Sequence, residues 1–131
     1  MHQDIRAYNK AQPKGLKEIC DSLANEIDHG LQGAESKVWH GGPVWFLDGN
    51  PIVGYWVRKD ATVQLLFWSG QSFEEPGLKP EGTFKAAEVR YGILADIKVT
   101  PLRRWLKKSK KIQWDYKNIV KRKGQLVRIL M

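Results

Sequence analysis

His40 is the residue of this chain whose type and setting most suggest chemistry, because Gly41-Gly42-Pro43 follows it directly. An imidazole titrates near neutral pH, binds metal ions and serves as a general acid or base. A zinc or catalytic site needs further ligands at suitable spacing, however, and His2 and His29 form no H-x-x-H or H-E-x-x-H pattern with it. We therefore interpret His40 as a structural residue at a point where the Gly-Gly-Pro sequence bends a strand, and keep it as a candidate ligand contact.

Known catalytic motifs are missing from the rest of the sequence. It contains no G-x-S-x-G, no P-loop, no dinucleotide-binding fingerprint and no evident Ser/His/Asp set. Glu74 and Glu75 are adjacent in a Gly/Pro-rich stretch, where two carboxylates do not flank a substrate. The single cysteine, Cys20, lies among apolar residues at helical spacing, so we expect a buried, unreactive thiol. We predict a protein that is not an enzyme.

Three tryptophans form a second candidate site, for a ligand. Side chains alternate along a strand, so Trp56 points to the opposite side from Tyr55, and Trp68 separates in the same way from its neighbours. If helices cover the Tyr55 side, then Trp56, Trp68 and Trp45 lie on an open side of the sheet. An apolar cluster there indicates a ligand groove, a protein interface or a homodimer contact. The alternative is that the C-terminal segment folds over the tryptophans and makes them core.

The third candidate is a basic C-terminal region. The chain has a net charge of +8, and twelve of its 22 Lys and Arg residues lie within 98–131, beside one acidic residue, Asp115. Such a region can attract nucleic acid, with Arg104, Lys108 and Lys111 on phosphates and nearby aromatic rings stacked on bases. Those aromatic residues fall on the apolar side of the predicted helix, however. We therefore favour the alternative, a solvated basic helix face.

Helices and strands predicted from the sequence must position these candidates. Asp4 caps a short helix that ends before Pro13, and apolar residues at helical spacing predict a second helix from Leu16 that Gly30 closes. Runs rich in β-branched and aromatic residues predict an antiparallel meander, with strands at 38–47, 52–58 and 62–68 and a weaker strand at 84–91. Asp48-Gly49 is the turn between the first two strands.

A last helical region, one kinked helix or two, follows the strands. Thr100 is its predicted N-cap, Pro101 its first residue, and helical spacing of apolar residues continues to Gly124. We predict an α+β fold in which N-terminal and C-terminal helices pack on one face of an antiparallel sheet of four to five strands.

The length of 131 residues predicts a single domain over 1–131, with its core at about 4–124 and a tail at 125–131. The sequence shows no signal-peptide pattern and no run of 18 apolar residues. We expect a cytoplasmic protein without a membrane partner.

Several of these segments together match one family. They are Asp4 and Tyr8, the K-V-W-H-G-G-P-V-W-F run, the Gly49 turn, Leu65-Leu66-Phe67 and the W-D-Y-K-N-I-V-K-R-K-G segment. Over residues 4–124 the chain resembles the YdhG-like domain family, long known as a domain of unknown function. Its most specific part is the W-H-G-x-P signature, here Trp39, His40, Gly41 and Pro43. The resemblance implies a small cytoplasmic α+β fold without a catalytic set, and some members are described as frataxin-like intracellular iron chaperones.

The iron role implied by this resemblance directs attention to carboxylates on the second predicted helix. Glu18, Asp21, Asn25 and Asp28 recur at i, i+3, i+7 and i+10, which gives one solvent-facing stripe. Carboxylates of Glu18, Asp21 and Asp28 can hold hydrated iron loosely through oxygen. An ordinary solvated helix face has the same pattern, and both Lys17 and the net positive charge oppose concentration of a cation.

The sequence therefore predicts a binding or chaperone-type domain. Its leading specific role, from the resemblance, is iron handling. The alternative, from the residues, is an interaction module that uses the tryptophan side of the sheet or the basic helix.

Overall fold

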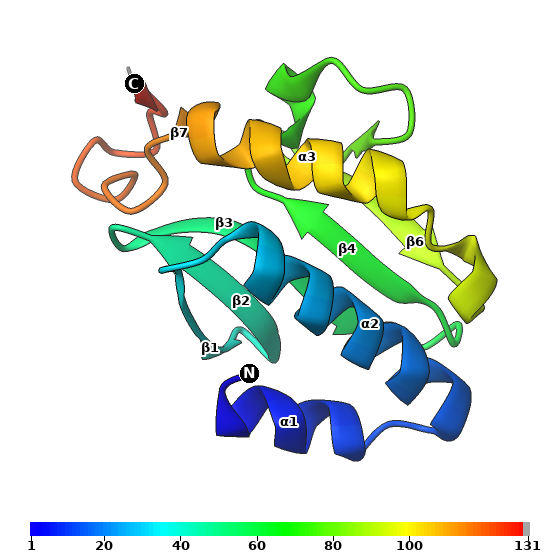
Figure 1. Ribbon diagram of the computed structural model, residues 1–131. Coiled ribbons are helices and arrows are strands. Elements are labelled where there is room, and N and C mark those ends of the chain that lie inside the picture. Colours follow the sequence, from blue (N-terminus) through cyan, green and yellow to red (C-terminus); the bar gives the residue numbers. More distant parts are fainter. Residues whose placement is uncertain (130–131) are drawn as a thin grey trace.

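A six-stranded antiparallel sheet carries the helices of this α+β fold on one of its faces (Figure 1). The computed structural model describes residues 1–129, and the strand order is β1-β2-β3-β4-β6-β5. The strands are β1 (Glu35–Trp39), β2 (Gly42–Leu47), β3 (Asn50–Val57), β4 (Val63–Phe67), β5 (Lys79–Pro80) and β6 (Ala87–Tyr91). A separate two-stranded hairpin pairs β7 (Gln113–Trp114) with β8 (Arg128–Ile129).

The helices of the described chain supply the other layer of the core. They are α1 (Gln3–Lys10), α2 (Lys14–Gly30) and α3 (Val99–Lys111), with short 3₁₀ helices η1 (Gly70–Phe73) and η2 (Leu94–Asp96). As predicted, α2 is amphipathic, and it buries Ile19, Leu23 and Ile27 against the sheet. Cys20 is also buried, and burial raises the pKa of its thiol to about 12. Nowhere in residues 1–129 is a helix long and apolar enough to cross a membrane.

Two tight turns connect the first three strands. His40-Gly41 joins β1 to β2, and Asp48-Gly49 joins β2 to β3. Both residues of each turn have positive φ, between 50° and 83°. This is the type I′ geometry, whose twist matches that of two antiparallel strands. The predicted turn at Asp48-Gly49 is confirmed, whereas the single bent strand predicted for 38–47 is wrong, because the chain reverses at His40-Gly41.

The strand count therefore differs from the predicted four to five. The run 38–47 contributes to two strands, and Lys79–Pro80, which lies outside every predicted strand, pairs with Glu88 and Ala87 of β6. The antiparallel arrangement itself is as predicted.

The C-terminal region is less helical than its spacing predicts. Helix α3 begins at Val99, so that Lys98 rather than Thr100 occupies the N-cap, and it ends at Lys111. Beyond it the chain extends into β7, and a series of turns leads back to β8. The predicted tail thus contributes a strand, while its last two residues lie outside the described part of the chain.

Asn50, at the start of β3, holds this extended segment in place. Its side chain is buried, and its Nδ2 donates to Gln113 Oε1 at 3.1 Å and to the Trp114 carbonyl at 3.0 Å. Its Oδ1 accepts from the backbone N–H groups of Tyr116 at 2.9 Å and Lys117 at 3.1 Å. These bonds give the backbone partners that a continuing helix would otherwise supply.

We expect Asn50→Ala to lower the free energy of unfolding by roughly 3 kcal/mol, because Tyr116 and Lys117 lose the acceptor of their N–H groups. Urea denaturation measures the change, and limited proteolysis should cut faster within 113–129. Asn25→Ala, at an exposed position of α2, is the matched control and should leave stability unchanged or slightly raised. Equal stability of the two variants would show that Asn50 does not anchor the segment.

Candidate functional site

Four aromatic side chains gather on the sheet face opposite the helices, which we call the open face: Trp39, Phe46, Trp56 and Trp68. The ring centres of Trp39 and Phe46 are 5.4 Å apart, those of Trp39 and Trp68 6.3 Å, and those of Trp56 and Trp68 5.8 Å. The three tryptophans are half-buried, and Phe46 is buried. Trp56 and Trp68 thus lie where strand alternation predicts them, and the cluster is one continuous aromatic surface.

Trp45 does not belong to this cluster, so its predicted position is wrong. Only 1% of Trp45 is exposed, its ring centre is 5.9 Å from that of Tyr55, and its Nε1 donates to Asp28 Oδ1 on α2 at 2.8 Å. The cause is the register of the hairpin, in which Trp45 pairs with Val53 on the helix side. Its neighbour Phe46 takes the open face instead.

His40 serves the structure through its backbone. It occupies the first position of the β1–β2 turn with φ of 51°, and its carbonyl accepts a hydrogen bond from Trp56 Nε1 at 3.0 Å. Its imidazole is exposed, and the ring centre lies 4.2 Å from that of Trp39. The structural role was predicted, but the bend that we expected at Gly41-Gly42-Pro43 is a hairpin turn.

A pocket of about 430 Å³, here called the aromatic pocket, opens beside three of these rings. Its lining consists of Lys37, Trp39, Phe46, Gly49, Pro51, Trp68, Tyr116, Lys117, Ile119 and Val120. The C-terminal segment therefore forms one wall and covers part of the open face, which combines the two alternatives drawn from the sequence. None of the described lining residues carries a carboxylate, a thiol or an imidazole.

Two lysines give the aromatic pocket its charge. Lys37 Nζ lies 5.1 Å from the centre of the Phe46 ring, a cation–π contact, and Lys117 Nζ donates to the Asp48 carbonyl at 2.7 Å. Sequence reasoning missed Trp39, Phe46 and both lysines. The signal for Trp39 and Lys37 was the alternation of β1, which is readable only once the turn at His40 is known.

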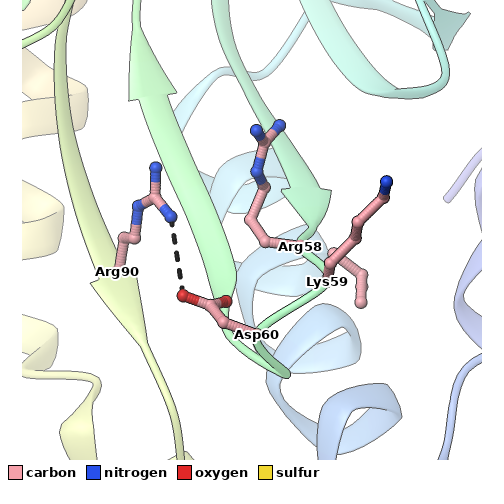
Figure 2. Close-up of a pocket in the computed structure, with 5 residues that line it drawn as sticks. Arg58, Lys59, Asp60 and Arg90 are labelled. Carbon is pink, nitrogen blue, oxygen red and sulfur yellow. Dashed lines mark ion pairs between the residues drawn. The ribbon is translucent and has the colours of Figure 1, made fainter.

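A second open pocket, of about 540 Å³, lies beyond Trp56 and is called the basic pocket (Figure 2). It is lined by Val57, Arg58, Lys59, Asp60 and Arg90. Arg90 is neutralised, since it lies 3.8 Å from Asp60 and 3.1 Å from Glu88. Within residues 1–129, neither Arg58 nor Lys59 has a carboxylate at ion-pairing distance, so the pocket retains positive charge.

The predicted metal ligands are not brought together. Asp21 accepts from Lys17 Nζ at 2.5 Å and from Asn9 Nδ2 at 3.0 Å, and Asp28 accepts from the Trp45 indole. Both carboxylates are only partly exposed, so the expected solvent-facing stripe with Glu18 does not form. In the described part of the chain, no cluster of three or more His, Cys, Asp or Glu residues could hold a metal ion. Iron handling stays a prediction from the resemblance.

The predicted nucleic-acid residues of α3 are in large part engaged with one carboxylate. Arg104 binds Glu75 through Nε at 2.9 Å and Nη2 at 2.7 Å, and Lys108 Nζ lies 2.6 Å from the same side chain. Trp105 Nε1 adds a fourth donor at 3.0 Å. Arg104 and Lys108 thus fasten the loop after η1 to the helix, and of the three predicted residues only Lys111 stays exposed and without an ion pair in the described chain.

Comparisons of the chain with protein-family models, with curated proteins and with solved structures find no match. Membership of the YdhG-like family therefore stays a prediction that rests on the residues quoted for it.

The side chain of Glu75 is 5% exposed, and Arg104, followed by Lys108 and Trp105, holds its pKa down at about 2. A carboxyl whose pKa is lower in the folded than in the unfolded state stabilises the fold above its unfolded value of 4.5. That stabilisation is lost as the pH falls from about 4.5 towards 2. We expect Glu75→Gln to lower the free energy of unfolding by roughly 2 kcal/mol at pH 7. The effect is no larger because solvent screens its partly exposed partners, Arg104 and Lys108.

The matched control is Glu74→Gln, because Glu74 is the adjacent, exposed residue. Urea denaturation between pH 7 and pH 2 should show a stability difference between wild type and Glu75→Gln that shrinks on acidification. A constant difference over this range, or an equal effect of Glu74→Gln, would mean that the Glu75 carboxylate does not fasten α3.

Proposed function

We propose that the chain is a binding domain whose ligand is a planar aromatic molecule with a negative charge, held in the aromatic pocket. The observation that carries this proposal is the meeting of aromatic rings with Lys37 and Lys117 in a pocket whose described lining has no carboxylate. Trp39 and Trp68 offer ring surface to a planar group, and the two ammonium groups favour an anion beside it.

The size and composition of the pocket support this class of ligand. Its volume of about 430 Å³ lies within the range of small-molecule sites, roughly 300 to 1,000 Å³. Most of its walls are apolar, with few polar groups at the edge, which is the usual arrangement where shape gives affinity and charge gives orientation. The walls offer stacking and charge, so they favour binding over catalysis.

Iron handling is a weaker proposal, because no observation on the described residues favours it. Asp21 and Asp28 are already hydrogen-bonded, and the chain carries a net charge of +8. We therefore favour the interaction module inferred from the tryptophans. The two lysines of the aromatic pocket favour an anionic ligand for it.

Two dyes that differ by a sulfonate test the proposal. We expect 8-anilino-1-naphthalenesulfonate to bind with one-to-one stoichiometry and more tightly than N-phenyl-1-naphthylamine, its uncharged analogue. The double variant Lys37→Gln/Lys117→Gln should weaken binding of the sulfonate about fivefold and leave the uncharged dye unchanged, since exposed ion pairs contribute up to about 1 kcal/mol. Dye fluorescence measures both affinities.

The matched control is Lys10→Gln/Lys107→Gln, which removes the same charge from exposed positions of α1 and α3. It should leave both dyes unaffected. If both double variants weaken sulfonate binding equally, or if the sulfonate binds no better than its analogue, the aromatic pocket is not an anion site.

A further inference from the structure

Trp56 lies across two glycines of the open face. A Cβ atom at Gly42 would lie 2.6 Å from Trp56 Cδ1, and one at Gly54 would lie 3.0 Å from Trp56 Cη2. The indole therefore rests on the backbone of β2 and β3, and its Nε1 is fixed to the His40 carbonyl. A ring whose inner side rests on glycine backbone presents its outer side to solvent, and the residue is only partly buried. Trp56 thus has a partly exposed ring next to Trp68, which lines the aromatic pocket.

Positive charge stands at both ends of the aromatic surface. Lys37 and Lys117 border the aromatic pocket, and Arg58 and Lys59 border the basic pocket. The aromatic surface and the basic pocket are contiguous. Trp56 pairs with Gln64 and Gln64 pairs with Arg90, so these three residues form one row across β3, β4 and β6. In Figure 2, Arg90 on β6 and Arg58 at the end of β3 are drawn on either side of β4.

The dimensions of the open face fit a short run of nucleotides. Five strands from β1 to β6 span about 19 Å at the usual spacing of antiparallel strands. Aromatic residues on a sheet of similar width stack two or three bases in a common RNA-binding fold. Bases stack on such rings only when they are unpaired, which favours a single strand over a duplex.

We propose that the ligand of the open face is single-stranded nucleic acid, with bases on Trp56, Trp68 and Trp39 and phosphates on Lys37 and Lys117 at one end and Arg58 and Lys59 at the other. This inference rests on the proposed function, since one base with its phosphate is the planar anion of the aromatic pocket. Glu88 and Asp60 also lie at this end, where Arg90 pairs with both, so that three cations, Arg58, Lys59 and Arg90, outnumber two carboxylates by one.

Charge disfavours a second copy of the chain as the occupant. A symmetric dimer through the open face would bring the same surface of both copies together, and Lys37, Arg58 and Lys59 of each would face like charges. Repulsion of this kind opposes self-association, whereas phosphates release counterions and bind.

Fluorescence anisotropy with labelled octamers of uridine and of thymidine tests the inference at several salt concentrations. We expect both to bind more tightly than a duplex of equal length, with affinity falling as salt rises. The variant Arg58→Gln/Lys59→Gln should weaken octamer binding and reduce the slope of log K against log salt by about 1.4, the change for two phosphate contacts on a single strand. Lys10→Gln/Lys107→Gln, with the same loss of charge, should change the slope by much less.

Trp56→Ala tests stacking on this ring and should weaken octamer binding about tenfold. If this variant fails to fold, the comparison of Arg58→Gln/Lys59→Gln with Lys10→Gln/Lys107→Gln still tests whether the open face binds the octamers. Equal binding of duplex and octamer, equal effects of the two charge variants, or a dimer in sedimentation that shields the tryptophans would overturn the inference. A preference between uridine and thymidine octamers would distinguish RNA from DNA.

The dye titration separates this inference from the proposed function. Sulfonate binding that depends on Lys37 and Lys117, without octamer binding, would retain the aromatic pocket as an anion site and reject nucleic acid as its ligand. If neither the sulfonate nor the octamers bind, the aromatic pocket is not a binding site.

Discussion

The register of β1, β2 and β3 determines what almost every side chain of this protein contacts. Side chains alternate along a strand, so a slip of one residue would exchange the faces of all of them. Two type I′ turns fix that register, together with a shift in the β2–β3 pairing, in which Trp45 pairs with Val53 but Phe46 with Pro51. As a result Trp45 bonds to α2 while Phe46 faces the other side. The core and the open face thus follow from the same turns.

Local signals in the sequence were enough for the parts that depend on local structure. The apolar spacing of α2, the Asp48-Gly49 turn and the side taken by Trp56 could all be predicted, because each needs only its own neighbours. The turn at His40 was missed because histidine is an uncommon residue at positive φ, although it tolerates that conformation. The end of α3 was missed because the competing partner, Asn50, lies more than 60 residues away in sequence.

The density of charge along the sequence overstates how much positive charge α3 leaves unpaired. Residues 98–131 hold most of the excess positive charge, yet Arg104 and Lys108 bind Glu75, and Arg103 binds Glu26 at 3.0 Å. Such pairs fasten α3 to the loop after η1 and to α2. Lys37, isolated in the sequence, has a neighbour of like sign, Lys117, only in the fold. A charge run in a sequence therefore says less about binding than the carboxylates that the fold brings to it.

Packing in the fold explains only the inner face of the Trp56 ring, the one that lies on the sheet. Glycine inside a strand is unfavourable by roughly 0.5 to 1 kcal/mol relative to alanine, and Trp56 offsets this at Gly42 and Gly54 by covering their backbone. That contact accounts for the inner side of the indole and for its hydrogen bond to His40. It does not account for the outer side of the ring or for the exposed edges of Trp39 and Trp68. The flanking Lys37 and Lys117 do have partners, the Phe46 ring and the Asp48 carbonyl. The backbone requires these glycines as well, because a Cβ atom would lie 2.5 Å from the Tyr55 carbonyl oxygen at Gly42 and 2.7 Å from the Pro43 carbonyl oxygen at Gly54.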